Sequence, residues 1–113
     1  MKLLTKEIEK TLAKYPIYSQ DGKKENAKIL VKFFLTCSDF TAYVLEAEKR
    51  ENGDYEFFGI IYLNGCAEYG YFTLSELQGI KNRFGLGVER DMYFCNQYVK
   101  DLPEHEQPLK NAY

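Results

Sequence analysis

The stretch GYFTLSELQGIKNRFGLGVERDMYF, residues 70–94, contains the pattern that decides the fold. It begins with aromatic residues that favour strands because they pack well on a pleated surface. Thr73 and Glu76 then have the spacing of a capping box, which predicts that a helix begins directly after Thr73. Apolar residues recur every three or four positions and give this helix one apolar face: Leu74, Leu77, Ile80 and Phe84. A short extended segment, residues 88–94, follows it.

Two glycines bear on the length of that helix. Gly85 suits the left-handed conformation that ends helices, so we expect the helix to stop there. Gly79 lies inside it, where glycine is about 1 kcal/mol less favourable than alanine, and a closely packed neighbour would explain its presence. Ser75 and Gln78 repeat the capping spacing two residues later, so the start of the helix is defined only to within two positions.

The rest of the chain predicts a sheet and one more helix. Leu4, Ile8 and Leu12 are four residues apart, with Thr5 as the cap of a helix that Pro16 ends. The segments with strand character are 28–36, 40–49, 55–63 and 67–72. Asn-Gly pairs at 52–53 and 64–65 predict hairpins between the last three of them. We therefore expect an α+β domain, an antiparallel four- to five-stranded curved sheet built as a meander, with an N-terminal helix and a second helix after strand 4, both helices on one face.

Alternation along the strands predicts which side chains face the core. Ile29, Val31, Phe33 and Leu35 should share one face of the first strand, and Glu46 and Glu48 should share an outward face of the second. The polar residues 19–27 read as an exposed loop. We expect residues 1–94 to form a single domain and residues 95–113 to form a partly ordered C-terminal tail.

Composition narrows the class of protein. The chain has 113 residues, enough for one core, and a net charge of -2, which argues against strong non-specific binding to nucleic acid. Ten tyrosines and eight phenylalanines favour a sheet. An odd number of widely spaced cysteines (Cys37, Cys66 and Cys95) indicates reduced thiols. The charged start MKLLTKEIEK is unlike a signal peptide, and no apolar run is long enough for a membrane span, so we expect a cytoplasmic protein with no membrane contact.

Few residues could carry chemistry. The one histidine, His105, lies in the tail, so a nucleophile paired with histidine would have to use it. Gly85-Leu86-Gly87 lacks the lysine of a phosphate loop. Six carboxylates could hold a catalytic metal, although outward strand faces explain their spacing: Glu46, Glu48, Glu56, Glu68, Glu89 and Asp91. We expect no catalytic residue, no metal site and no cofactor, and the residues favour a non-enzymatic protein over an enzyme.

Two further groups of residues have a structural and a functional interpretation. In the run Glu89-Arg90-Asp91, Arg90 points to the opposite face from its neighbours; inward, it would need a buried acid such as Glu68, and in a groove it would bind phosphate or carboxylate. Six tyrosines on the strands suit either core packing or stacking of nucleobases: Tyr43, Tyr55, Tyr62, Tyr69, Tyr71 and Tyr93. Packing is favoured because the same strands carry mostly glutamate.

Five segments together resemble a known family. They are MKLLTKEI at the start, VKFF at 31–34, FFGIIYLNG at 57–65, GYFTLSEL at 70–77 and GLGVERDMYF at 85–94. In order and spacing they are similar to the domain of unknown function 2958 family, over residues 1 to about 94. The resemblance implies a small cytosolic bacterial protein of the kind that plasmids, phages and conjugative elements carry. It implies no reaction and no catalytic residue. Some members are labelled single-stranded DNA endonucleases, and nothing in these residues supports that label.

Such a setting suggests two functions. The first is a non-enzymatic accessory protein of a mobile genetic element that binds a host or phage protein, such as a nucleic-acid-guided nuclease, and inhibits host defence in the manner of an anti-CRISPR protein. Its contact residues would be the acidic hairpin and the charged run near residue 90: Glu46, Glu48, Glu51, Asp54, Glu56, Glu89, Arg90 and Asp91. The alternative is a protein that binds or processes single-stranded nucleic acid through a basic groove of Lys2, Lys6, Lys10, Lys14, Lys28 and Lys32.

Overall fold

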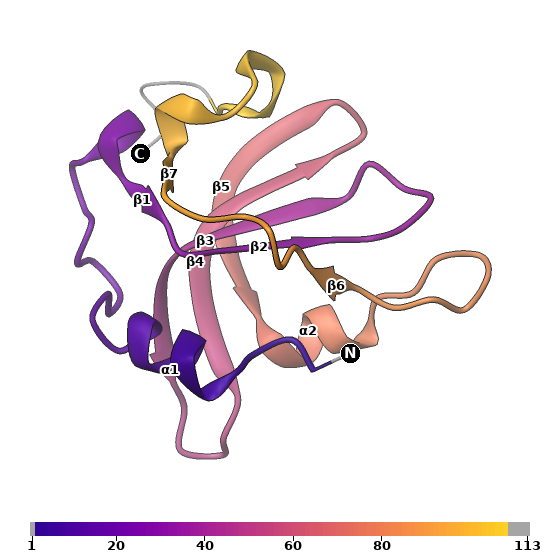
Figure 1. Ribbon diagram of the computed structural model, residues 1–113, viewed down its shortest axis with the longest axis horizontal. Coiled ribbons are helices and arrows are strands. Elements are labelled where there is room, and N and C mark those ends of the chain that lie inside the picture. Colours follow the sequence, from indigo (N-terminus) through magenta and orange to yellow (C-terminus); the bar gives the residue numbers. More distant parts are fainter. Residues whose placement is uncertain (1, 109–113) are drawn as a thin grey trace.

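A computed structural model describes residues 2–108 and has a five-stranded antiparallel sheet at its centre (Figure 1). Its strands are β2 (Val31–Phe34), β3 (Thr41–Lys49), β4 (Tyr55–Leu63), β5 (Cys66–Thr73) and β6 (Glu89–Arg90). The first four form a meander, and β6 returns to pair with β2, so the order across the sheet is β5-β4-β3-β2-β6. The predicted α+β meander is confirmed.

Two short helices lie on one face of this sheet. In α1 (Lys6–Leu12) the Thr5 side chain caps the N-terminus by accepting from the Ile8 N–H at 3.2 Å. In α2 (Leu74–Gly79) the capping box of Thr73 and Glu76 is complete. Both predicted caps are confirmed, because each depends only on local spacing that the sequence displays.

The remaining elements are short, and through them residues 24–29 contact the C-terminal segment. They are the 3-10 helices η1 (Lys24–Asn26), η2 (Val99–Asp101) and η3 (Glu104–Glu106) and the strands β1 (Lys28–Ile29) and β7 (Gln97–Tyr98). β1 and β7 pair as a separate two-stranded antiparallel ribbon. The segment that contains β7, η2 and η3 therefore lies beside the N-terminal part of the chain (Figure 1).

A separate apolar core covers each face of the sheet. The first core is built under α1 and α2 from Leu3, Leu4, Leu12, Val31, Phe33, Leu35, Phe40, Ala42, Val44, Ala47, Tyr55, Phe57, Phe72, Leu77 and Val88. The second core, on the opposite face, consists of Ala27, Ile29, Tyr43, Leu45, Ile60, Val99 and Leu102. Helices on one face and the C-terminal segment on the other leave a sheet that is buried on both sides along much of its length.

The expected tail begins inside this second core. Val99 and Leu102 are only 2% and 5% exposed, and Phe94 packs against the same cluster. The Val99 N–H donates to the Ala27 carbonyl at 3.0 Å. Residues 95–108 thus pack on the sheet, and the rest of the expected tail, residues 109–113, lies outside the described residues.

Two irregularities in the strands change which residues share a face. The predicted first strand is broken at Leu30, whose N–H donates to the Val44 carbonyl at 2.8 Å. Ile29 consequently joins the second core, whereas Val31 belongs to the first, so the prediction that they share a face is wrong. In β3 the register shifts between Val44 and Glu46, which makes a β-bulge at Leu45.

Both helices are shorter than their apolar patterns predict. The α1 helix ends at Leu12 rather than near Pro16, because the chain turns so that the Tyr15 carbonyl accepts from the Ala47 N–H at 2.9 Å. The α2 helix ends at Gly79, and Ile80 is already extended. A Cβ at Gly79 would have no neighbour within 4 Å, so the expected close contact is absent there. Gly85 has the predicted left-handed φ, 79°, within a turn rather than at a helix end.

Candidate functional site

Glu46, expected on an outward face, is a buried carboxylate with only 2% exposure. Its two carboxylate oxygens accept from the backbone N–H groups of Tyr18 and Gln20, each at 2.8 Å. The bulge at Leu45 turns both that residue and Glu46 toward the second face, and residues 18–20 fold over them. The prediction of an exposed Glu46 is therefore wrong, since strict alternation holds only for a strand without a bulge.

Gln20 completes this buried arrangement. Its side-chain amide donates to the carbonyls of Leu45 at 2.7 Å and Lys28 at 2.8 Å, and its oxygen accepts from the Lys28 N–H at 2.7 Å. At 1% exposure it contradicts the expectation that residues 19–27 form a wholly exposed loop. No sequence signal identified Gln20, because a polar loop of this composition normally stays in water.

The other acids of the predicted hairpin have different roles. Asp54 accepts from the Ser75 hydroxyl at 2.7 Å and from the Ser75 N–H at 3.1 Å, so it anchors the start of α2. The bond from the Ser75 hydroxyl lowers the pKa of Asp54. Glu56 forms an ion pair with Arg50 at 3.0 Å. Of the predicted acids of the hairpin, Glu48 and Glu51 are exposed, whereas Asp54 and Glu56 are half-buried.

The charged run Glu89-Arg90-Asp91 lies at the β6 edge of the sheet, away from the β3–β4 hairpin. Arg90 donates to the backbone carbonyls of Lys2 and Leu3, both at 2.8 Å, and so fixes the N-terminal segment over the first core. Glu89 accepts from the Thr36 hydroxyl at 3.0 Å. Asp91 lies 3.7 Å from the Lys32 ammonium. Since β2 separates β6 from β3, this run and the acidic hairpin do not form one surface.

Glu68, named as a partner for an inward Arg90, lies on β5 at the opposite edge of the sheet. The strand order therefore rules out the expected ion pair between them. The inward orientation itself holds, because the Arg90 guanidinium reaches carbonyls of the segment that packs on the first core. The guanidinium, which has several N–H donors, here bonds two backbone carbonyls at once.

A groove of about 420 Å³ opens beside Glu46 on the second face. Its lining consists of Tyr18, Asp21, Glu46, Phe58, Tyr69, Gly70 and Tyr71, and we call it the tyrosine groove. Tyr18 and Tyr71 are 72% and 52% exposed. The Phe58 ring stacks on Tyr69 at a centroid distance of 5.9 Å and tilts against Tyr71 at 5.0 Å. The groove thus brings two of the predicted tyrosines, Tyr69 and Tyr71, together with Tyr18 from the loop and two carboxylates, Asp21 and Glu46, into one concave surface.

Backbone geometry and charge set the character of this groove. Tyr18 has a φ of 75°, a region that residues with side chains adopt rarely, and its N–H bond to Glu46 holds it there. Burial raises the pKa of Tyr71, and contact with Tyr18 and the charge of Glu46 raise it further. Burial also raises the pKa of Tyr69, with Glu25 adding to the effect. Carboxylates and neutral phenols give the groove a negative potential that favours cations.

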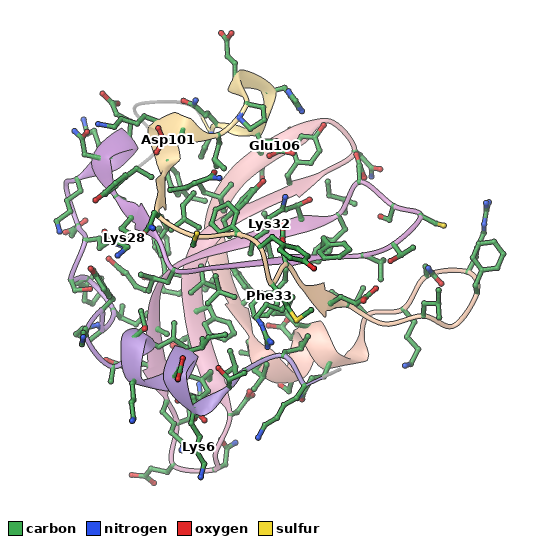
Figure 2. All side chains as sticks on the ribbon, viewed as in Figure 1. Lys6, Lys28, Lys32, Phe33, Asp101 and Glu106 are labelled. Atoms are coloured by element: carbon green, nitrogen blue, oxygen red, sulfur yellow. The ribbon has the colours of Figure 1, made fainter. Side chains whose placement is uncertain are left out.

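The lysines proposed for a basic groove are divided between the two faces. Lys6 belongs to α1, which covers the first core. The Lys32 ammonium lies over the Tyr43 ring, 5.8 Å from its centroid, on the second face. Figure 2 places Lys6 at one end of the molecule, far from Lys28 and Lys32 in the view. The structure does not bring these three lysines together.

On the second face, Tyr43 donates a short hydrogen bond from its hydroxyl to the Glu106 carboxylate. Burial raises the pKa of Tyr43 well above its usual range, and the Glu106 carboxylate adds to this effect. The Glu106 side chain thereby ties η3 to β3, with the His105 ring edge-on to Tyr62 at 5.6 Å.

The side chains that could hold a metal or act as nucleophiles are dispersed over the part of the chain that the structure describes. In residues 2–108, no three His, Cys, Asp or Glu side chains gather closely enough to hold a metal ion. Cys37, Cys66 and Cys95 are all exposed free thiols. Within the same residues, no helix has the length and apolar character needed to cross a membrane.

The architecture defines a class of α+β domain, in which an antiparallel meander carries both helices on one face and its C-terminal segment on the other. The chain belongs to the family described as protein of unknown function DUF2958, whose model matches residues 3–101. This match confirms the resemblance seen in the sequence and extends past β7 into η2. No curated protein and no solved structure matches the chain.

Proposed function

We propose that the protein acts by binding another protein, without a reaction of its own, and that the tyrosine groove is the contact surface. The observation that carries this proposal is the pairing of two exposed tyrosines, Tyr18 and Tyr71, with two lining carboxylates, Asp21 and Glu46. Tyrosine is enriched among residues that dominate protein–protein binding energy. Among residues 2–108 no lysine or arginine lines the groove, so its natural complement is a basic segment.

The class of partner follows from that charge. Nucleic-acid-guided nucleases hold their nucleic acid in positively charged channels, which offer basic segments to an acidic ligand. The resemblance described in the sequence implies an accessory role in a mobile genetic element in the cytoplasm, and that role is part of the proposal. We therefore propose that the protein inhibits a host defence nuclease, in the manner of an anti-CRISPR protein, because this function needs both an acidic contact surface and an accessory role. Glu48 and Glu51 at the end of the hairpin would extend the acidic contact beyond the groove.

The test is recovery of a complex on the immobilised protein from a bacterial lysate that contains defence nucleases, after nuclease digestion of nucleic acid. Glu46 is unsuitable for mutation here, because its substitution would disturb the fold. Asp21→Lys and Tyr71→Ala alter exposed groove residues instead. Glu104→Lys makes the same change of charge on η3 as a matched control.

We expect Asp21→Lys and Tyr71→Ala each to weaken the complex about tenfold or more, as truncation of a central interface residue does. The Glu104→Lys variant should bind as the unmodified protein does. Equal binding by all three variants would exclude the tyrosine groove as the contact surface. A parallel Glu48→Lys variant reports whether the hairpin tip takes part.

The second candidate is binding of single-stranded nucleic acid, favoured by the stacked rings of Phe58 and Tyr69, whose planes differ by 7°. Such sites combine aromatic platforms with a basic groove. The measurement is retention of labelled single strands at low salt, which should fall steeply as salt rises. Retention that Lys28→Glu and Lys32→Glu abolish would support this function over protein binding, since Lys32 lies on the same face as the stacked rings.

A further inference from the structure

Residues 81–87 form a hairpin-like loop that projects from the sheet between α2 and β6, and we call it the finger (Figure 1). An isolated antiparallel bridge joins Lys81 to Gly87 at its base. Above this bridge the Asn82 N–H donates to the Leu86 carbonyl at 2.8 Å. The Gly85 N–H returns to the Asn82 carbonyl at 3.0 Å, with Gly85 in the left-handed conformation. The backbone of the finger is therefore closed on itself.

The Asn82 side chain holds the finger in one orientation. Its oxygen accepts from the N–H groups of Phe84 at 2.8 Å and Leu86 at 3.0 Å. Its amide nitrogen donates to the Thr36 carbonyl, just beyond β2, at 2.8 Å. One half-buried side chain thus ties the tip of the finger to its base and the base to the sheet.

This rigid backbone presents apolar side chains to solvent. Phe84 is 62% exposed and Leu86 is 50% exposed. The Arg83 guanidinium lies over the Phe84 ring, 5.0 Å from its centroid. Lys81 and Arg83 are the charged residues of the finger, and it contains no acid. The tip is therefore apolar and its rim is positive.

We propose that the finger inserts Phe84 and Leu86 into an apolar pocket, rimmed by carboxylates, on a partner protein. The proposal rests on the proposed function, because it supplies a second contact to the protein that the tyrosine groove binds. A preorganised loop loses little conformational entropy on docking, so apolar side chains held this way suit a specific pocket. Opposite charge on the rim of the pocket complements Lys81 and Arg83.

A lipid surface is the less suitable occupant. A single myristoyl chain gives only marginal membrane attachment, and two side chains on one loop bury less apolar surface than that chain. A protein pocket, by contrast, gains from both the apolar tip and the fixed geometry. Phenylalanine and arginine together are also typical of the centres of protein interfaces.

The experiment uses the complex recovered on the immobilised full chain, with a photo-crosslinking phenylalanine analogue at position 84 and, as a control, at position 63. Leu63 is an exposed apolar residue, 41% exposed, at the far end of β4. We expect crosslinking from position 84 to a partner peptide that contains apolar residues and Asp or Glu, and none from position 63. The double variant Phe84→Ser, Leu86→Ser should dissociate about tenfold faster, and Leu63→Ser should dissociate as the unmodified protein does.

Three outcomes would overturn the proposal. An unchanged dissociation rate for the double variant, while Asp21→Lys still weakens the complex, would remove the finger and leave the proposed function standing. Binding of phosphatidylglycerol vesicles that the double variant loses would assign the finger to a lipid surface instead. Recovery of no complex on the unmodified protein would overturn both proposals. Thermal unfolding of each variant confirms that the fold is retained.

Discussion

Glu46 shows how one buried carboxylate orders a whole loop, since it holds two backbone donors of residues 18–20. Its replacement by alanine would leave the buried N–H of Gln20 and the partly buried N–H of Tyr18 without their acceptors. We expect Glu46→Ala to lower the free energy of unfolding by roughly 2–5 kcal/mol. Urea denaturation measures this loss.

The matched control is Glu48→Ala, on the same face of β3 but exposed. Its effect should stay within about 0.5 kcal/mol, as is usual for surface substitutions. A Glu46→Ala variant as stable as the control would contradict the role assigned to the buried carboxylate. The sequence alone predicts that Glu46 and Glu48 are equally exposed. Strict alternation along a strand does not reveal the bulge at Leu45, which buries Glu46.

Gly59 and Gly70 lie opposite each other on β4 and β5, and they differ sharply in surroundings. A Cβ added at Gly59 would lie 1.8 Å from the Tyr43 carbonyl oxygen, whereas one added at Gly70 would meet nothing within 4 Å. We expect Gly59→Ala to destabilise the fold by about 3 kcal/mol or more, because the β3 backbone would have to move.

The Gly70→Ala variant provides the comparison within the same strand pair. It should be neutral or stabilising by about 0.5 kcal/mol, since alanine restricts the unfolded chain more than glycine does. Chemical denaturation of both variants gives the difference directly. Similar stabilities for the two would mean that the close approach of β3 and β4 at Gly59 does not constrain the sheet.

At the scale of elements, the start of α2 is fixed by three side chains. Thr73 and Glu76 form the capping box, and Asp54 from the β3–β4 hairpin accepts from Ser75. We expect Thr73→Ala to lower the free energy of unfolding by about 1 kcal/mol, the usual cost of losing an N-cap. Thr73→Ser keeps the hydroxyl and should recover most of that loss. Equal losses in both variants would show that the methyl group, rather than the cap, matters.

The two ends of α2 illustrate what a sequence reveals about an element. Its start could be predicted because capping depends on residues three apart in the chain. Its end could not, because Ile80 and Phe84 continue the helical spacing although the chain turns at Ile80. The end of α2 is explained by Asn82, whose side chain accepts from the nearby backbone N–H groups of Phe84 and Leu86 and so competes with helix formation. That competition depends on the Thr36 carbonyl, a neighbour that only the fold provides.

For the candidate site, prediction from sequence was limited in the same way. The exposed acid Glu48 and the inward Arg90 follow from alternation along a strand. The tyrosine groove does not, because it combines a strained loop residue, Tyr18, with residues of β4 and β5. Likewise the second core includes Val99 and Leu102, which belong to the segment predicted as a tail. Two apolar residues among charged ones show no periodicity from which a packed element could be predicted.

At the scale of the whole molecule, buried tyrosines make stability depend on alkaline pH. Burial raises the pKa of Tyr55 to about 12, and its hydrogen bond to Glu9 at 2.8 Å adds to this effect. In the unfolded chain the same hydroxyl titrates near its usual value of about 10. The stabilisation is therefore complete below pH 10 and is lost as the pH rises from about 10 to about 12.

We expect the urea midpoint of the protein to fall across that range. Tyr55→Phe should reduce the slope of this fall, because the ionisable group is gone. Tyr93→Phe, at a side chain that is 92% exposed, should follow the unmodified protein. Identical slopes for all three proteins would refute the contribution of Tyr55. Burial also raises the pKa of Tyr43, so part of the slope should persist in the Tyr55→Phe variant.

The ribbon of β1 and β7 has a consequence for the speed of folding. It pairs Lys28 with Tyr98, and β6 pairs with β2, so both contacts join segments far apart in the chain. The meander of β3, β4 and β5 needs only short loops and can form early. Long loops must close before the ribbon forms, and this entropic cost slows proteins whose contacts are distant in sequence. We therefore expect folding on the scale of milliseconds to seconds, with docking of η2 as its last step.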